Sequence, residues 1–303
     1  MSDKDSFFKY FLFFILCAIW STTWAMIKIG LDDTPPLIGL SLRFLTASIV
    51  MFSIVIITKR KISLDKDLIK LYLIVGVLSQ ALSYFCTYWG TQYIPSSLAS
   101  ILWVTLPLFV GIFAHFSVEG ERLNLSRIFS IVLATVGVVA ILSDQKIVFS
   151  VEMILGSSIV LFGVFIAAWP SIYVKTFKKH YDPFVLTACA IGIAAVIHTT
   201  LSLIFERWSA MVWDFKNIGS FVYLGVLGSA TTFMIYYWLI KHIRVVKLSF
   251  VTFITPVFAC IIGFAFLGEM ITFQEIFGVF FIFFGIIIFD WKRYWILLGI
   301  GRP

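Results

Sequence analysis

Long apolar stretches follow one another along the chain, separated by short polar or Gly/Pro-rich breaks. Most approach the roughly 20 apolar helical residues that cross the hydrocarbon core of a bilayer. A span must satisfy its own backbone hydrogen bonds where there is no water, which favours helices. The stretches are too long and too uniformly apolar for the alternating strands of a membrane barrel. The pattern predicts an all-α integral membrane protein with ten transmembrane helices, over 7–30, 36–57, 68–90, 96–116, 125–143, 152–174, 184–205, 218–240, 247–267 and 274–291.

Composition and charge agree with this prediction. The chain is 61% hydrophobic and only 13% charged, whereas an ordinary soluble domain carries about 25% charged residues. The net charge of +7 does not indicate a nucleic-acid partner, because the basic residues sort by side of the membrane. With the N-terminus inside, most fall in cytoplasmic breaks, which predicts a multi-pass protein of the cell inner membrane with both termini cytoplasmic. The basic residues expected on the opposite side are Lys28, Lys146, Arg207 and Lys216.

One hydrophobic unit occurs twice, about 149 residues apart with a one-residue slip. It consists of an aromatic helix end, a short loop, a helix with a proline, a Gly-Glu turn and a closing helix with a central glycine. The first copy includes Tyr88-Trp89, Ile94, Ser100, Pro107, Gly120-Glu121 and Gly137, and the second Tyr237-Trp238, Ile243, Ser249, Pro256, Gly268-Glu269 and Gly285.

The repeat predicts how the two halves are oriented. Each half, 1–145 and 146–303, holds five predicted helices. Five is an odd number, so the second half enters the membrane from the opposite side and the repeats are inverted. Inverted repeats typically place a substrate site at their interface near the midplane and work by alternating access.

The order and duplication of these motifs resemble the drug/metabolite transporter superfamily, specifically its EamA-type ten-helix members. The extra Glu119 before Gly120 departs from the usual pattern. The resemblance implies a transporter and a peripheral seventh helix. The motifs that carry it are Ala18-Ile19-Trp20-Ser21-Thr22-Thr23-Trp24 with Lys28, Arg43, Tyr84 to Trp89, Leu106-Pro107 with Gly120-Glu121, and Thr255-Pro256 with Leu267-Gly268-Glu269.

Polar and aromatic residues inside the spans indicate a candidate cavity. Arg43 is costly in a span and therefore a functional candidate, although its head could instead snorkel outward. Gln80, Tyr84 and Tyr88 recur every four residues on one helix, either lining a cavity or packing helices through hydrogen bonds. The predicted substrate-binding residues are Trp20, Ser21, Thr22, Gln80, Tyr84, Tyr88, Trp103, Trp169, Tyr236, Thr252 and Arg43.

Prolines within spans remove a backbone donor and tend to kink a helix. Pro107, Pro170 and Pro256 are therefore hinge candidates, with tolerance of proline in a buried bundle as the alternative. Glu121 and Glu269 suit helix boundaries better than substrate contacts.

The sequence offers little for catalysis, cofactors or coupling by protons. No Asp or Glu lies in the middle of a span, which removes the usual intramembrane proton carrier. His198 suits a structural role better than a proton relay. Neither a metal or cofactor site nor an enzyme is expected, because the histidines are dispersed and the acids confined to loops. The cysteines, all within spans and without paired spacing, are Cys17, Cys86, Cys189 and Cys260.

The function predicted from these features is transport. A cavity of aromatic residues, hydroxyls and amides suits small amphipathic metabolites, and the family resemblance favours export of amino acids or related compounds. The expected partners are a small-molecule substrate and the lipid bilayer, with the chain as a monomer or homodimer. A facilitative channel-like pore and a non-transport membrane protein are the alternatives.

Overall fold

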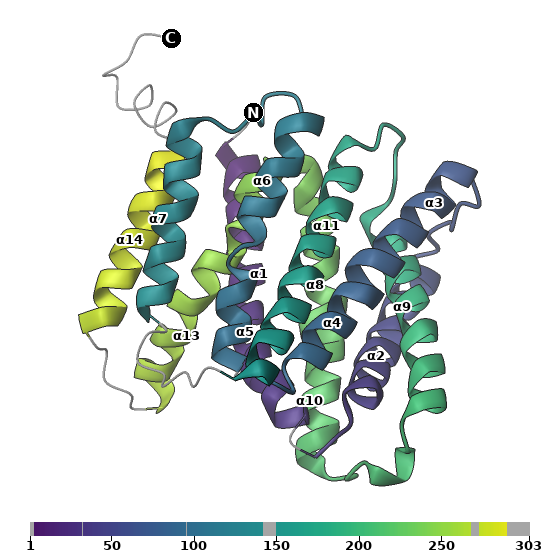
Figure 1. Ribbon diagram of the computed structural model, residues 1–303. Coiled ribbons are helices and arrows are strands. Elements are labelled where there is room, and N and C mark those ends of the chain that lie inside the picture. Colours follow the sequence, from purple (N-terminus) through teal and green to yellow (C-terminus); the bar gives the residue numbers. More distant parts are fainter. Residues whose placement is uncertain (1–2, 32, 95, 142–149, 268–272, 290–303) are drawn as a thin grey trace.

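A computed structural model describes residues 3–31, 33–94, 96–141, 150–267 and 273–289, in which every regular element is a helix (Figure 1). The elements are α1 (Asp3–Leu31), α2 (Pro36–Ile57), α3 (Lys66–Ile74), η1 (Val75–Leu82), α4 (Ser83–Gly90), α5 (Ser96–Trp103), α6 (Leu106–Ser117), α7 (Leu125–Ile141), α8 (Val151–Thr176), α9 (Pro183–Phe205), η2 (Trp208–Ala210), α10 (Phe215–Gly225), η3 (Val226–Thr231), α11 (Thr232–His242), α12 (Val245–Ser249), α13 (Val251–Leu267) and α14 (Phe273–Phe289).

The helices follow the ten predicted spans. Seven described stretches are long and apolar enough to cross a membrane, and three shorter apolar helices lie at 125–140, 245–258 and 276–289. Four predicted spans consist of more than one element, which hydrophobicity alone does not reveal: α3–η1–α4, α5–α6, α10–η3–α11 and α12–α13. The all-helical membrane fold is therefore confirmed, and the new feature is where its helices are interrupted.

Matching spans of the two halves run in opposite directions. In Figure 1 the span that begins with α3 descends to α4, whereas the span that begins with α10 ascends to α11. Each contains a π-helical segment at the matched position, η1 in the first and η3 in the second. π-Helical turns are rare and frequently occur at functional sites.

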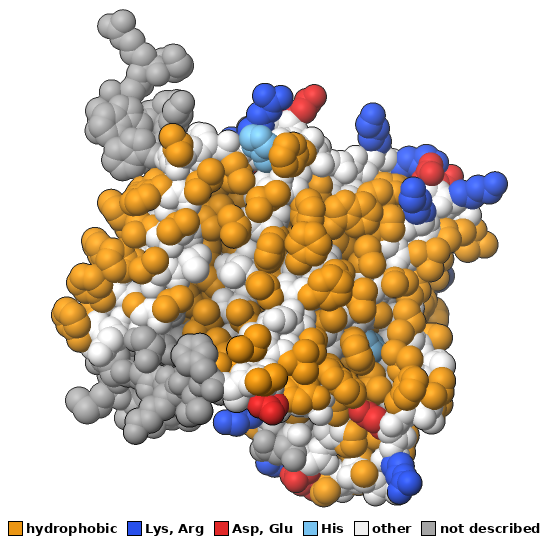
Figure 2. Space-filling view, viewed as in Figure 1, with side chains coloured by type: hydrophobic (Ala, Val, Ile, Leu, Met, Phe, Trp, Pro, Cys, Tyr) orange, Lys and Arg blue, Asp and Glu red, His pale blue; other side chains and the backbone are white. Residues whose placement is uncertain are grey.

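The outer surface suits lipid. Figure 2 shows hydrophobic side chains across the middle of the molecule, with Lys and Arg concentrated toward its two ends. Exposed large hydrophobics such as Phe162, Val196 and Phe280 lie on several helices. In water such a surface would be strongly unfavourable, whereas in a bilayer it is matched by the acyl chains.

The duplicated glycines hold α7 close to α14. A Cβ atom on Gly137 would lie 2.6 Å from the Gly278 carbonyl oxygen, and one on Gly285 would lie 2.7 Å from the Ser130 carbonyl oxygen. The Ser130 hydroxyl also donates a hydrogen bond to the Gly285 carbonyl. Small residues let helix backbones approach closely in membranes, so this part of the repeat is structural.

The Gly-Glu turn of the first copy links the two halves. Gly120 has φ +76°, a left-handed conformation that glycine adopts without steric cost. Glu121 follows and is 4% exposed. Its Oε1 and Oε2 accept hydrogen bonds from the amides of Val245 at 3.0 Å and Val246 at 3.1 Å. Glu121 thus caps the first turn of α12, which confirms a helix-boundary role, while Glu269 lies outside the described residues.

Glu206 makes the reciprocal kind of contact just beyond the end of α9. Its Oε1 and Oε2 accept hydrogen bonds from the amides of Leu37 at 3.0 Å and Ile38 at 2.8 Å, at the start of α2. Burial raises the pKa of this carboxyl, and the two amide hydrogen bonds oppose that shift. Each half therefore supplies a carboxylate that satisfies amides at a helix start in the other half.

The predicted prolines do not all lie in mid-helix. Pro170 is inside α8 and Pro256 inside α13. Pro107 is in the first turn of α6, after a break that follows α5, so its placement within a continuous helix was wrong. Proline suits the first turn because its missing N–H has no helical acceptor there.

Candidate functional site: a cavity between the two halves

A cavity lies between the two halves of the described structure. Both halves contribute to its wall. The lining residues are Trp20, Thr23, Trp24 and Ile27 of α1, Arg43 of α2, Ser79 of η1, Tyr84 and Thr87 of α4, Ser100 and Trp103 of α5, Leu106 of α6, Ala167 and Ser171 of α8, Phe233 and Tyr236 of α11, and Thr252 and Thr255 of α13.

One face of α1 forms part of the wall. Trp20 lies there as predicted, together with Thr23, Trp24 and Ile27, at the three- and four-residue spacing of a helix face. Ser21 and Thr22 do not line the cavity. The Ser21 hydroxyl bonds the Ala18 carbonyl, and the Thr22 hydroxyl lies 2.5 Å from that of Tyr223.

The third span presents a different face from the predicted stripe. Tyr84 lines the cavity, together with Ser79 and Thr87. Gln80 is fully buried beside it and donates a hydrogen bond to the Tyr237 hydroxyl at 2.9 Å. The π-helical segment η1 contains residues 75–82, and its wider turn changes which side chains align with those of α4.

Arg43 is the charged group of the cavity wall. It is 1% exposed, so it does not snorkel to the membrane surface. Its Nε donates to the Ser229 hydroxyl at 2.8 Å, its Nη1 to the Tyr88 hydroxyl at 3.1 Å and its Nη2 to the Gly228 carbonyl at 3.0 Å. Tyr88 therefore supports Arg43 from outside the cavity lining, and the guanidinium joins the first half to η3 of the second.

The two π-helical segments are each met by a polar side chain from the opposite half. Gly228 of η3 receives the hydrogen bond of Arg43. The Gln80 carbonyl of η1 lies 3.4 Å from the His198 Nε2 of α9. Carbonyl groups in π-helical turns need such partners where the regular helical ladder is interrupted. His198 is fully buried and absent from the cavity lining.

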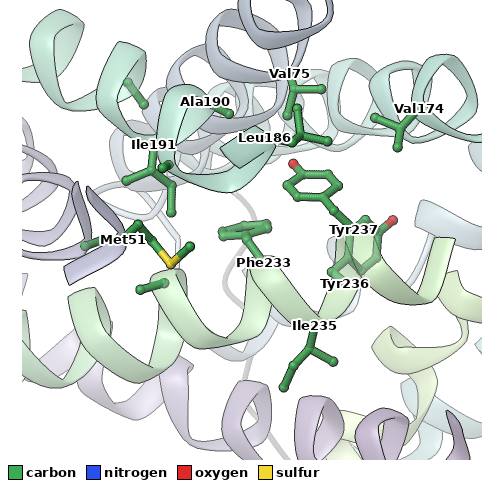
Figure 3. Close-up of a cluster of buried hydrophobic side chains, with 14 of the residues drawn as sticks. Met51, Val75, Val174, Leu186, Ala190, Ile191, Phe233, Ile235, Tyr236 and Tyr237 are labelled. Atoms are coloured by element: carbon green, nitrogen blue, oxygen red, sulfur yellow. The ribbon is translucent and has the colours of Figure 1, made fainter. Parts of the chain in front are cut away.

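Aromatic side chains from both halves meet at the wall. The Trp20 ring centroid is 5.8 Å from those of Phe233 and Tyr236, and the Tyr84 centroid is 5.9 Å from that of Phe233. Figure 3 shows Phe233, Tyr236 and Tyr237 on one helix, with the Tyr237 ring extending toward Leu186 and Val75. The Tyr236 hydroxyl lies 2.9 Å from that of Ser171.

Among the remaining predicted residues, Trp103 and Thr252 line the cavity. The Trp103 indole donates to the Thr87 hydroxyl at 3.2 Å. Trp169 does not belong there: it is 39% exposed and packs beside Tyr173 on the surface. Ala167 and Ser171 occupy the inward face of α8 four residues apart, which turns position 169 outward.

The sequence-based site omitted several lining residues. Residues three or four positions away lie on the same face of a helix, so extending the search by this spacing from each predicted residue that lines the cavity would have found many of them. The omitted residues are Thr23, Trp24, Ile27, Ser79, Thr87, Ser100, Leu106, Ala167, Ser171, Phe233 and Thr255.

The cavity's chemistry is aromatic and hydroxyl-rich with a single cationic side chain. The described residues contain no group of three or more His, Cys, Asp or Glu suited to hold a metal ion. Cys17, Cys86 and Cys189 are free thiols and do not line the cavity, while the Cys260 side chain lies outside the described set. The arrangement can bind and orient an organic solute.

A family model for EamA-like transporters matches the chain twice, over residues 7–143 and 154–289. The chain belongs to the EamA-like transporter family. It is thus a multi-pass membrane transporter of the drug/metabolite superfamily, and a small-molecule substrate and the lipid bilayer are its expected partners.

Several transporters of this family type are similar over most of their length. The uncharacterized transporter YoaV of Bacillus subtilis is 29% identical over 262 residues, which cover 86% of this chain and 89% of that protein. An uncharacterized transporter of Archaeoglobus fulgidus is 25% identical, and the alignment covers 94% of this chain and 99% of that protein. The uncharacterized inner membrane transporter YedA of Escherichia coli is 25% identical, and the alignment covers 86% of this chain and 83% of that protein.

A solved crystal structure shares the fold. It aligns with a TM-score of 0.79 at 18% sequence identity and covers 94% of this chain and 98% of its own. At this identity the similarity concerns the arrangement of the helices.

Proposed function

We propose that the protein is a carrier that moves small amphipathic metabolites, amino acids or related compounds, through the cavity by alternating access. The observation that carries the proposal is a cavity whose wall combines residues of both halves. Ligand pockets are typically mostly apolar, with a few placed polar groups, and this wall has that composition.

The inverted arrangement supports a mechanism in which residues 1–145 and 146–303 rock against each other. Equivalent spans run in opposite directions, so a movement that opens the cavity to one side has a counterpart that opens it to the other. The break between α5 and α6 just before Pro107, the break at Phe250, and the prolines inside α8 and α13 give places where the spans can bend. Pro107, Pro170 and Pro256 are the proposed hinges.

The direction of transport in this proposal is export across the cell inner membrane, with both termini cytoplasmic. The placement of the basic residues supports this orientation. The end of the molecule formed by the α2–α3 loop and the α8–α9 loop carries Arg60, which pairs with Asp182, and Lys179, which lies 2.9 Å from Asp65. That basic end is the proposed cytoplasmic face.

Counterflow in liposomes tests the carrier proposal. Purified protein reconstituted with an unlabelled metabolite inside is expected to accumulate the same labelled metabolite transiently, for at least one member of a broad amino-acid and organic-acid panel. We expect Trp20→Ala and Tyr84→Ala to reduce this counterflow by about tenfold or more. Each removes apolar surface that a bound solute would bury, worth about 1.5–3 kcal/mol for a large side chain, and an aromatic contact worth about 0.5–1.5 kcal/mol more.

Trp213→Ala is the matched control, since this tryptophan is 59% exposed and is not one of the residues that line the cavity. It should transport at the unmodified rate. Absence of counterflow for every solute by the unmodified protein, or equal loss in the Trp20 and Trp213 variants, would contradict the proposal.

A further inference from the structure

Arg43 is a buried positive charge whose partners are all neutral. Its three hydrogen bonds go to the hydroxyls of Ser229 and Tyr88 and to the Gly228 carbonyl. The ion pairs within the described residues involve Arg60 and Lys179, which lie in loops. Among the described residues, those that line the cavity include no Asp or Glu, and the sequence places none in the middle of any span.

An uncompensated charge at this position is costly. Removing a guanidinium from water is unfavourable by several kcal/mol even after relaxation, and neutral hydrogen-bond partners offset this only in part. If the role of Arg43 were only to tie α2 to η3, a neutral side chain such as Gln could donate to the same carbonyl without that cost. The position is therefore better suited to a counter-charge that enters the cavity than to a purely structural link.

The hydrogen bonds of Arg43 fix its guanidinium in a position where it can bind a negatively charged group in the cavity. Its Cζ atom lies 4.7 Å from the centroid of the Tyr84 ring, and its three hydrogen bonds use only part of the donors that a guanidinium offers. A held, planar guanidinium suits bidentate binding of a carboxylate. Trp20, Tyr84 and Tyr236 on the same wall provide apolar surface for the rest of the molecule.

We propose that the transported solute carries a carboxylate, which Arg43 binds inside the cavity while the aromatic wall holds an apolar body. This inference rests on the proposed carrier function and adds the solute's required charge. A single carboxylate neutralises the single cation of the lining, whereas a doubly charged phosphate would leave one negative charge uncompensated. An amine without a carboxylate would bring a second positive charge next to Arg43.

Binding of two matched ligand series tests the proposal. One series has a phenylethyl body and the other an isopentyl body, and each body carries in turn a carboxylate, an α-amino acid group, a primary amide or an amine. Titration calorimetry on the purified protein is expected to show binding of carboxylates and amino acids about tenfold or more tighter than of amides and amines. Arg43→Gln should weaken carboxylate binding by about tenfold to a hundredfold, as expected for lost hydrogen bonds to a charged group, and leave amide binding unchanged.

Two further variants separate charge from structure. Arg43→Lys keeps the charge without the planar fork and should bind carboxylates with intermediate affinity. Lys28→Gln removes a charge at the exposed end of α1 and should change nothing.

Equal affinity of unmodified protein for carboxylates, amides and amines would overturn the inference, and this comparison needs no variant to fold. Equal weakening of all ligands by Arg43→Gln would also overturn it, since that marks a structural role. Counterflow that is independent of solute charge would leave the carrier proposal standing and reject this inference alone. If no member of either series showed binding or counterflow, both the carrier proposal and this inference would be rejected.

Discussion

Replacing Glu121 with alanine is expected to lower the free energy of unfolding by about 3 kcal/mol. The substitution leaves the amides of Val245 and Val246 without their acceptors, and both residues are at most 1% exposed. Each buried donor left unsatisfied costs about 1–3 kcal/mol. The measurement is unfolding of the purified protein in mixed micelles with increasing denaturing detergent.

Glu119→Ala is the control for this experiment. Glu119 lies two residues earlier in the same turn and is exposed, so its removal should change stability by less than about 0.5 kcal/mol. Glu121→Gln retains one carbonyl oxygen as an acceptor and should fall between the two. If Glu121→Ala were no less stable than Glu119→Ala, the cap between the halves would not have the importance assigned to it.

Gly225→Ala is expected to destabilise the protein by about 2 kcal/mol and to reduce transport. A Cβ atom there would lie 2.6 Å from the Thr46 Cβ and 2.9 Å from the Arg43 carbonyl oxygen. Neither atom is the end of a flexible side chain, so α10 and α2 must separate, and overpacking of this kind costs about 1–3 kcal/mol. Because α2 carries Arg43, the same displacement moves the guanidinium relative to the cavity. Unfolding in mixed micelles and counterflow measure the two effects.

Gly219→Ala on the same helix provides the comparison. A Cβ atom at Gly219 would have no neighbour within 4 Å, and alanine favours a helix over glycine by about 1 kcal/mol. This variant should be slightly more stable and transport normally. A similar loss of stability in both variants would contradict the account, because the close approach of α2 exists only at Gly225.

The spans were predictable from hydrophobicity, but their internal breaks were not. The range 36–57 coincides with α2, because an apolar run bounded by prolines and a basic cluster has few alternative ends. The range 68–90 predicts one helix, yet it contains η1 between α3 and α4. A π-helical turn depends on contacts with neighbouring helices, here on His198 and Arg43 from the opposite halves, and single-span hydrophobicity carries no such information.

The same limit explains which of the predicted residues the structure places in the cavity wall. Trp20, Tyr84 and Tyr236 are large aromatics at mid-span depth, and the structure brings them together. Ser21 and Thr22 were predicted because they lie at the same membrane depth as Gln80 and Tyr84. Depth does not determine which face a residue occupies, because successive residues of a helix point about 100° apart. The matched glycines Gly76 and Gly225, 149 residues apart, were missed, yet extending the repeat upstream of Tyr88 would have found them.

The central claim is that the cavity between the halves is a solute site reached from each side of the membrane in turn. Single cysteines test it directly, in a background where Cys17, Cys86, Cys189 and Cys260 are replaced by alanine. Thr23 lines the cavity and Ser21, on the same helix, does not.

In proteoliposomes of known orientation, a membrane-impermeant thiol reagent should modify the Thr23→Cys variant when added to either side, and a transported solute should slow the reaction. The Ser21→Cys variant should remain unmodified. Reaction of Thr23→Cys from neither side, or at the rate of Ser21→Cys with no effect of solute, would contradict the account.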